Sequence, residues 1–163
     1  MIIGRKAASL AAVASALAGM ALFAAPAHAD TAITRSVQNY ADDTNLDAPD
    51  GHQVFTRDPH WGSQVWTFNQ VSTTPTGIGI YTISSLWFGA CIQDAGVDSA
   101  VTQQPCDPNK LSQRWVVDFG QQATTIASEK NLNDVLQGNG IDTPVTLKQA
   151  NSAPNQLWTL YNK

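Results

Sequence analysis

The sequence predicts an all-β protein assembled from three similar copies of about four short strands each. Gln-x-Trp followed by β-favouring residues occurs three times, as SQVWTF at 63–68, SQRWVV at 112–117 and NQLWTL at 155–160. The three glutamines are 49 and 43 residues apart, and self-similarity at a period of roughly 20–50 residues indicates a repeat architecture. Outside the N-terminal segment, no window keeps the apolar spacing of three and four residues that is typical of an amphipathic helix.

The N-terminal segment has the three parts of a secretory signal peptide. Arg5 and Lys6 form a basic head, an apolar stretch follows over residues 10–23, and the small residues of AHA at 27–29 come before Asp30. This order predicts a signal peptide over residues 1–29 that is cleaved before Asp30. An uncleaved anchor is the alternative, but the apolar stretch is shorter than the roughly 20 residues of a membrane span. We therefore expect a secreted, extracellular protein.

The predicted mature chain, residues 30–163, is acidic and has the length of one domain. It contains 7 basic and 13 acidic residues, which gives a net charge of −6. Nucleic acids and anionic membranes attract basic surfaces, so we expect neither as a partner. We expect a monomer without a membrane span.

Each copy shows the same succession of segments, which places the repeats at about 30–70, 71–119 and 120–163. A β-favouring run comes first, as TRSVQ at 34, GIYTIS at 79 and TTIAS at 124. A triplet with an apolar centre follows, as NLD at 45, CIQ at 91 and NLN at 131. A turn rich in Gly and Asp, a segment led by Val54, Val101 or Val145, and the Gln-x-Trp strand complete the copy.

The Gln-x-Trp pairs are predicted to form the core of the repeat. Residues i and i+2 of a strand share a face, so Gln and Trp point the same way. Trp66, Trp115 and Trp158 would converge around a pseudo-threefold axis, each burying on the order of 150–250 Å². The amide of a residue such as Gln113 would bridge backbone groups of the preceding loop that otherwise lack partners.

The two cysteines, Cys91 and Cys106, are expected to form a disulfide, because paired cysteines are usual in exported chains. The bridge would close a loop of about 15 residues and stabilise the fold by roughly 3 kcal/mol. Two free thiols are the alternative. Neither cysteine has a Cys-x-x-Cys partner or a nearby His, so no metal site is expected.

Repeat 2 resembles the ricin-type β-trefoil lectins, including secreted bacterial ones. Its segment ACIQDAGVDSAVTQQPCDPNKLSQRW at 90–115 is similar to the family pattern Cys-Leu-Asp, Gly, Val-x-x-x-x-Cys and Gln-x-Trp. The resemblance extends over the whole mature chain and implies a single β-trefoil domain of three pseudo-threefold repeats. It places Cys91 and Cys106 at the two disulfide positions. The equivalent pairs in the other copies are Asn45 with Pro59 and Asn131 with Ala150.

The resemblance also implies where a sugar would bind. Binding copies in the family have an Asp at the end of the triplet, an aromatic platform after the Val, and a polar residue before a Gln that holds the Asp. A carboxylate accepts from adjacent sugar hydroxyls while an aromatic face packs on the C–H side of the ring. In repeat 1 these places hold Asp47 and Gln64, with Arg57 at the platform and His60 and Trp61 in the adjoining loop.

Repeats 2 and 3 depart further from this pattern. Repeat 2 has Gln93 for the Asp and Gln104 for the aromatic residue, and is expected to be silent. Repeat 3 has Asn133 at the Asp place, followed by Asp134, and Lys148 at the platform. The candidate carbohydrate-binding residues are therefore Asp47, His60, Trp61, Gln64, Asn133, Asp134, Asn155 and Gln156.

The expected function is binding of a glycan or polysaccharide without catalysis and without a cofactor. The sequence lacks a Gly-x-Ser-x-Gly elbow, a phosphate loop and a His-Glu-x-x-His motif. His52 and His60, which follow Asp50 and Asp58, are expected in solvated turns. No enzyme is therefore predicted.

Two alternatives stay open beside the lectin hypothesis. One is a protein-binding trefoil, either the targeting subunit of a toxin or a proteinase inhibitor, and the other is a trefoil that has lost ligand binding. The consecutive aromatic residues Trp87 and Phe88 bear on this choice. On a strand they would face opposite sides, which would leave one of them exposed as part of a partner surface.

Overall fold

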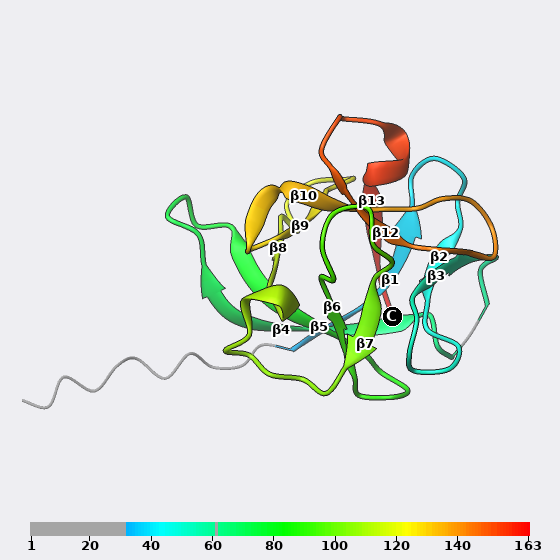
Figure 1. Ribbon diagram of the computed structural model, residues 1–163, viewed down its shortest axis with the longest axis horizontal. Coiled ribbons are helices and arrows are strands. Elements are labelled where there is room, and N and C mark those ends of the chain that lie inside the picture. Colours follow the sequence, from blue (N-terminus) through cyan, green and yellow to red (C-terminus); the bar gives the residue numbers. More distant parts are fainter. Residues whose placement is uncertain (1–31, 61) are drawn as a thin grey trace, which may run out of the picture.

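The structure, a computed structural model, describes residues 32–60 and 62–163. The predicted signal peptide and Trp61 lie outside the described residues. The described part contains one thirteen-stranded sheet and two short 3₁₀ helices, so the all-β prediction is confirmed (Figure 1). None of its helices is long and apolar enough to cross a membrane.

The strands follow the three repeats in order. Repeat 1 contains β1 (Ile33–Asn39), β2 (Asn45–Asp47), β3 (Phe55–Arg57) and β4 (Val65–Thr73). Repeat 2 contains β5 (Gly79–Ser85), β6 (Cys91–Gln93), β7 (Thr102–Gln104), the 3₁₀ helix η1 (Leu111–Gln113) and β8 (Trp115–Val117). Repeat 3 contains β9 (Ile126–Ser128), β10 (Asn131–Gln137), β11 (Thr143–Pro144), β12 (Thr146–Gln149), η2 (Pro154–Gln156) and β13 (Trp158–Asn162). The extra two-residue β11 pairs with β3 of repeat 1.

All pairings between named strands are antiparallel, and they join neighbouring repeats. β1 lies between β4 and β13, β5 pairs with β4 and β8, and β8 pairs with β9. The path through the strands is not closed into a barrel. Within repeat 3, an isolated bridge joins the segment before β9 to the start of β13, because Thr124 and Trp158 exchange two backbone hydrogen bonds of 2.9 and 2.8 Å.

Three valines form a ring of backbone hydrogen bonds between the repeats. The N–H of Val54 donates to Val101 over 3.2 Å, that of Val101 to Val145 over 2.9 Å, and that of Val145 back to Val54 over 2.9 Å. All three side chains are fully buried. These residues begin the Val-led segments of the sequence, so the ring marks the pseudo-threefold axis and ties each repeat to the other two.

The three repeat tryptophans fill the core with the same contact in each copy. Trp66, Trp115 and Trp158 are fully buried. Their indole N–H groups donate over 2.9, 3.2 and 3.1 Å to the carbonyl oxygens of Leu46, Ile92 and Leu136, respectively. This bond satisfies the polar atom of a buried indole, as a closely packed interior requires.

Gln and Trp do not share a strand, which corrects the sequence-based expectation. Gln113 and Gln156 end the 3₁₀ helices η1 and η2, and the strands β8 and β13 begin at the tryptophan. The 3₁₀ turn lets each glutamine point inward, where it is almost completely buried. Glutamine and tryptophan therefore both face the core because a 3₁₀ turn precedes the strand, and not because they alternate along one strand.

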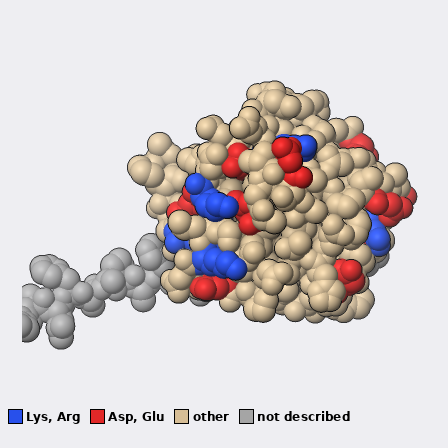
Figure 2. Space-filling model, in the orientation of Figure 1, with Lys and Arg blue, Asp and Glu red and all other residues tan. Residues whose placement is uncertain are grey.

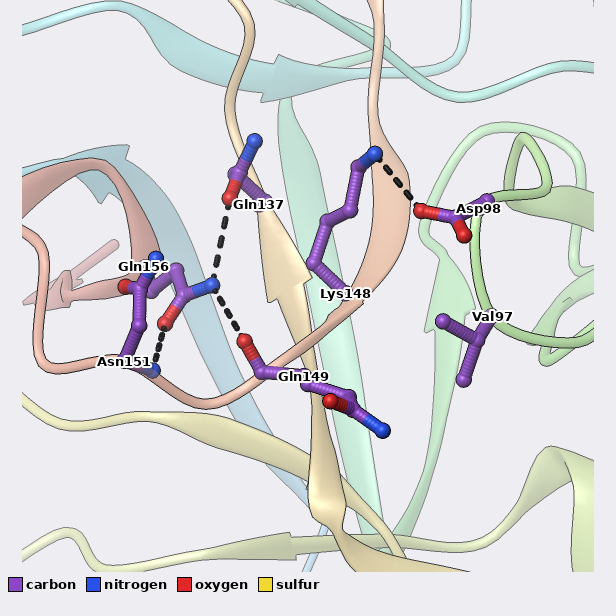
Figure 3. A pocket seen from close by; sticks show the side chains of 7 residues that line it. All are labelled: Val97, Asp98, Gln137, Lys148, Gln149, Asn151 and Gln156. Carbon is purple, nitrogen blue, oxygen red and sulfur yellow. Dashed lines mark hydrogen bonds and ion pairs between the residues drawn. The ribbon is translucent and has the colours of Figure 1, made fainter.

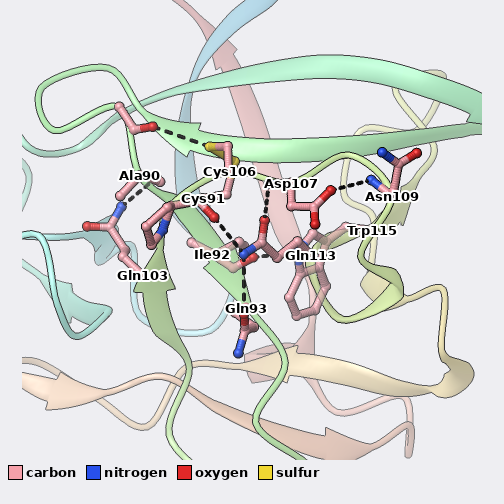
Figure 4. The surroundings of a disulfide bond; sticks show 12 residues. Ala90, Cys91, Ile92, Gln93, Gln103, Cys106, Asp107, Asn109, Gln113 and Trp115 are labelled. Carbon is pink, nitrogen blue, oxygen red and sulfur yellow. Dashed lines mark hydrogen bonds between the residues drawn. A yellow bond between two sulfur atoms is a disulfide. The ribbon is translucent and has the colours of Figure 1, made fainter.

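Two further features of repeat 2 bear on function. Cys91 at the start of β6 is disulfide-bonded to Cys106 beyond β7 (Figure 4). Trp87 and Phe88 lie in a turn between β5 and β6 and not on a strand, so the expectation that they face opposite sides is wrong. Both rings are exposed, with ring planes only 23° apart.

Candidate functional site

The glutamine of each Gln-x-Trp holds the loop that precedes it. The side-chain oxygens of Gln64, Gln113 and Gln156 accept from the backbone N–H groups of His60, Asp107 and Asn151, over 2.7, 2.8 and 2.9 Å. Their amide nitrogens donate to the backbone carbonyls of Asp58, Pro105 and Gln149, over 2.8, 3.0 and 3.0 Å. These bonds fix which residues correspond in the three copies (Figures 3 and 4).

The position that should carry a ligand-binding carboxylate is the last residue of the triplet. It holds Asp47 in repeat 1, Gln93 in repeat 2 and Gln137 in repeat 3, each directly after the residue whose carbonyl accepts from the core tryptophan. In repeats 2 and 3 the amide of the Gln-x-Trp glutamine donates to this residue, over 3.2 and 3.1 Å. The three positions are therefore equivalent in space but differ in chemistry.

In repeat 1 the carboxylate is covered. The side chain of Asp47 is fully buried, whereas that of His60 is 49% exposed. Ser63 Oγ donates to one oxygen of Asp47 over 2.5 Å, and His60 Nε2 lies 3.4 Å from the other. The ring of His60 is itself held by Gln64, whose amide nitrogen lies 2.7 Å from His60 Nδ1. Among the described residues, Ser63 and His60 therefore cover this carboxylate.

In repeat 2 a lysine occupies the equivalent place. Lys110 Nζ donates to Gln93 Oε1 over 2.7 Å, and Gln113 donates to the same oxygen. Because the acceptor of Gln93 already has two donors, repeat 2 offers little to a ligand hydroxyl. That repeat 2 is silent stays a prediction.

In repeat 3 the equivalent position opens into a pocket of about 500 Å³ (Figure 3). Gln137, Lys148, Gln149, Asn151 and Gln156 of repeat 3 line it, together with Val97 and Asp98 from the β6–β7 loop of repeat 2. Lys148 Nζ is ion-paired with Asp98 over 2.7 Å, and this pair joins the two repeats across the pocket. Its walls therefore carry amide donors and acceptors as well as one charge of each sign.

Charged side chains are sparse on the face of the molecule that Figure 2 shows. On the face shown in Figure 2, basic and acidic side chains are interspersed among uncharged ones. At Asp50, hydrogen bonds from the backbone N–H groups of His52 and then Gln53 lower the pKa of the carboxyl group below its usual value. The ionised carboxylate of Asp50 therefore holds the backbone of the turn at residues 50–53 through these two hydrogen bonds.

No family model and no curated protein matches the chain. Its fold, in contrast, matches solved structures. The designed threefold-symmetric protein ThreeFoil is 16% identical, with a TM-score of 0.67 over 80% of this chain and 99% of its own. The ricin B-like lectin of Macrolepiota procera, solved in complex with lactose, is 22% identical, with a TM-score of 0.62 over 80% of this chain and 95% of its own.

The chain has the β-trefoil fold of the ricin B-like lectins. A third similar structure is an endo-β-galactosidase from Clostridium perfringens that releases GlcNAcα1-4Gal. It is 10% identical with a TM-score of 0.63, and the match covers 78% of this chain but 32% of the enzyme. These identities establish a shared fold.

Within this trefoil, the sequence-based alignment of repeat 3 is corrected. Asn133 and Asp134 do not lie at the pocket, because the triplet of repeat 3 is 135–137 and not 131–133. Asp134 is buried and accepts from the side chain of Asn131 over 3.1 Å, while Asn133 is exposed at the start of β10. Val135, and not Asn131, is accordingly the counterpart of Cys91.

The other predicted site residues divide between two places. Gln156 lines the repeat 3 pocket, whereas Asn155 supports it by donating to the carbonyl of Gly138 over 3.1 Å. Asp47, His60 and Gln64 are brought together in repeat 1, and Trp61 lies outside the described residues. The sequence alignment missed Gln137, Asn151 and the Val97–Asp98 pair. The distance from the triplet to Gln-x-Trp could have identified Gln137, but no sequence signal marks a loop from a neighbouring repeat.

Proposed function

We propose that this protein binds carbohydrate, and that the repeat 3 pocket is its principal sugar site. The observation that carries the proposal is the contrast between the three equivalent positions. Asp47 is covered by Ser63 and His60, and Gln93 is bonded to Lys110, whereas Gln137 lines an open pocket. The lactose complex of the Macrolepiota procera lectin, which has the same fold, supports the choice of ligand class.

The lining of the pocket suits the hydroxyl groups of a sugar. The amides of Gln149 and Asn151 carry donors and acceptors, and neighbouring hydroxyls of a sugar need both. The amide of Gln137 accepts from Gln156 over 3.1 Å and donates to Asn139 over 2.9 Å, which leaves one N–H and one lone pair for a ligand. Lys148 and Asp98 add charge-assisted hydrogen bonds, which are stronger than neutral ones. Val97 gives a small apolar contact in place of an aromatic platform, so we expect weak affinity, with a Kd on the order of 1 mM for one sugar unit.

A substitution at Gln137 tests the proposal with a matched control from the second repeat. Gln137→Ala removes a side chain that lines the pocket, and Gln93→Ala removes the equivalent side chain, which also accepts from its Gln-x-Trp glutamine. We expect Gln137→Ala to lower sugar affinity at least about tenfold, and Gln93→Ala to leave it within about twofold. Glycan arrays and insoluble polysaccharides would identify the ligand, and calorimetry would measure the affinity.

The result that would contradict this assignment is equal affinity of both variants for a glycan that the unmodified protein binds. A protein that binds nothing on the arrays or the polysaccharides would remove the carbohydrate proposal altogether. In that case a pull-down against secreted proteins would be the next experiment, because the sequence leaves a protein-binding trefoil open as an alternative to the lectin.

We also propose that the protein acts outside the cell as a monomer and without catalysis. The Cys91–Cys106 disulfide supports export, because such bonds persist mainly in oxidising compartments. The basic and apolar segment at residues 1–29 supports it independently. Mass spectrometry of the secreted protein is expected to find Asp30 as its first residue, and an N-terminus at residue 1 would contradict cleavage.

A further inference from the structure

A turn in repeat 2 presents two aromatic rings to solvent. Trp87 is 67% exposed and Phe88 is 43% exposed, and their ring centroids lie 6.4 Å apart. The turn is ordered by Ser85, whose hydroxyl accepts from the backbone N–H groups of both residues over 3.3 Å. Two nearly parallel rings are thus held at the surface, although each would gain free energy by burial.

The two rings are fitted to glycines of repeat 1. A Cβ atom at Gly62 would lie 2.2 Å from Trp87 Cζ3, and one at Gly51 would lie 3.0 Å from Phe88 Cγ. Both glycines have left-handed backbone conformations, with φ of +98° and +72°, which other residues adopt with strain. The aromatic shelf, defined as Trp87 and Phe88, is therefore built into the junction between repeats 1 and 2.

A pocket of about 380 Å³ lies beside the shelf, lined by Phe88, His52, Gln103 and Gln104 among others. Gln103 is only 3% exposed. Its amide nitrogen donates to the carbonyl of Ala90 over 3.0 Å (Figure 4). Within residues 32–60 and 62–163, no group donates a hydrogen bond to its buried Oε1 atom.

A ligand could supply the hydrogen-bond donor that the side-chain oxygen of Gln103 lacks in the described part of the chain. A buried acceptor without a partner costs about 1–3 kcal/mol, so such groups are rare in native proteins. Because Oε1 is closed to solvent, a ligand that fills the pocket would donate to it once the Gln103 side chain turns toward the pocket, and would at the same time cover the ring of Phe88. A pyranose ring has hydroxyl donors and an apolar C–H face in one rigid unit, and it matches both requirements.

We propose that the shelf and the pocket beside it form a second carbohydrate site, which takes a neutral pyranose residue of a glycan. The ring would stack on Phe88, which lines the pocket and lies beside Trp87, and donate a hydroxyl to Gln103 Oε1. His52 and Gln104 would contact the other hydroxyls. The site goes beyond the repeat 3 pocket and shares no lining residue with it.

The surroundings favour an uncharged and rigidly placed ligand. Asp50 precedes the Gly51–His52 wall, and the lowered pKa of its carboxyl group keeps a negative charge there. That charge disfavours acidic sugars. Cys106 Sγ lies 3.3 Å from the carbonyl oxygen of Gly89, so the disulfide packs directly against the opposite wall.

The test is an NMR titration of the isotope-labelled full-length protein with three neutral probes: lactose, cellotriose and chitotriose. At least one probe is expected to shift the indole N–H signal of Trp87 and the side-chain amide signal of Gln103. Phe88→Ala, which removes the aromatic ring that lines the pocket, is expected to weaken this binding at least about tenfold. Tyr161→Ala, which removes another exposed aromatic side chain, is the matched control and should leave the affinity unchanged.

The same spectra separate this proposal from that for repeat 3. Shifts at Gln103 and Trp87 that persist in Gln137→Ala would support the second site. Shifts confined to Gln137 and Gln156 would overturn the second site and leave the repeat 3 pocket in place. No shift at Gln103 or Trp87 with any of the three probes, or an unchanged affinity in Phe88→Ala, would overturn the proposal.

Discussion

At the residue scale, a single aspartate shows how tertiary contacts decide the role of a side chain. Asp47 stands at the place where the family resemblance puts a ligand-binding carboxylate, yet its side chain is fully buried. Ser63 donates to it and His60 lies over it, so the carboxylate here holds two loops together. The sequence could predict the position of Asp47 but not its burial, because burial depends on how two side chains of another loop are oriented.

The buried bond between Ser63 and Asp47 predicts a loss of stability when the hydroxyl is removed. Ser63→Ala leaves one oxygen of a buried carboxylate without its donor, and we expect the free energy of unfolding to fall by about 1–3 kcal/mol. Urea denaturation of the unmodified protein and of the variant would measure this difference in the free energy of unfolding. Ser112→Ala is the matched control in repeat 2, because no hydrogen bond of the Ser112 hydroxyl occurs in the described part of the chain. Equal losses in both variants would show that the Ser63–Asp47 bond contributes nothing.

At the element scale, β10 explains why the site in repeat 3 was misplaced. This strand contains Leu132 and Leu136, and each could be the apolar centre of a triplet. Leu132 is 57% exposed, whereas Leu136 is fully buried and accepts from Trp158. The tryptophan follows its acceptor by 20, 23 and 22 residues in the three copies. Leu132 is 26 residues from Trp158, so spacing favours Leu136.

The turn between β5 and β6 shows where the alternating pattern of a strand stops predicting which side chains are exposed. Alternation of exposed and buried faces applies only while the backbone stays extended. The chain leaves the strand after Ser85, whose hydroxyl accepts from the backbone N–H groups of Trp87 and Phe88, and both aromatic side chains are then exposed. The glycines that accommodate the rings belong to another repeat. A local pattern could not predict a contact of that kind.

At the scale of the whole molecule, the fold was the most predictable feature. The three Gln-x-Trp copies predicted an all-β protein of three repeats, the family resemblance implied a β-trefoil, and the structure confirms both. It was predictable because each tryptophan makes the same core contact, so one local signal is repeated three times. The pockets were less predictable because each combines side chains of two repeats with independent loop sequences.

The valine ring predicts that two repeats cannot fold without the third. In a fragment of residues 30–119, Val101 would lose its acceptor Val145, and Val54 would lose its donor. The core would also lack Trp158. We expect this fragment to show no cooperative thermal transition by circular dichroism, whereas residues 30–163 should unfold in one. A sharp transition of the fragment would show that the repeats are independently stable.

The pairing of β1 with β13 affects the timing of folding during synthesis. β13 is made after every other strand of the trefoil, and it pairs with β1 from Arg35–Asn162 to Asn39–Trp158. Until β13 has left the ribosome, one edge of β1 stays open and the core lacks its third indole. The chain therefore remains incompletely folded throughout the translation of all three repeats. For the export proposed above, this long interval would give translocation of the unfolded chain time to begin before the trefoil is complete.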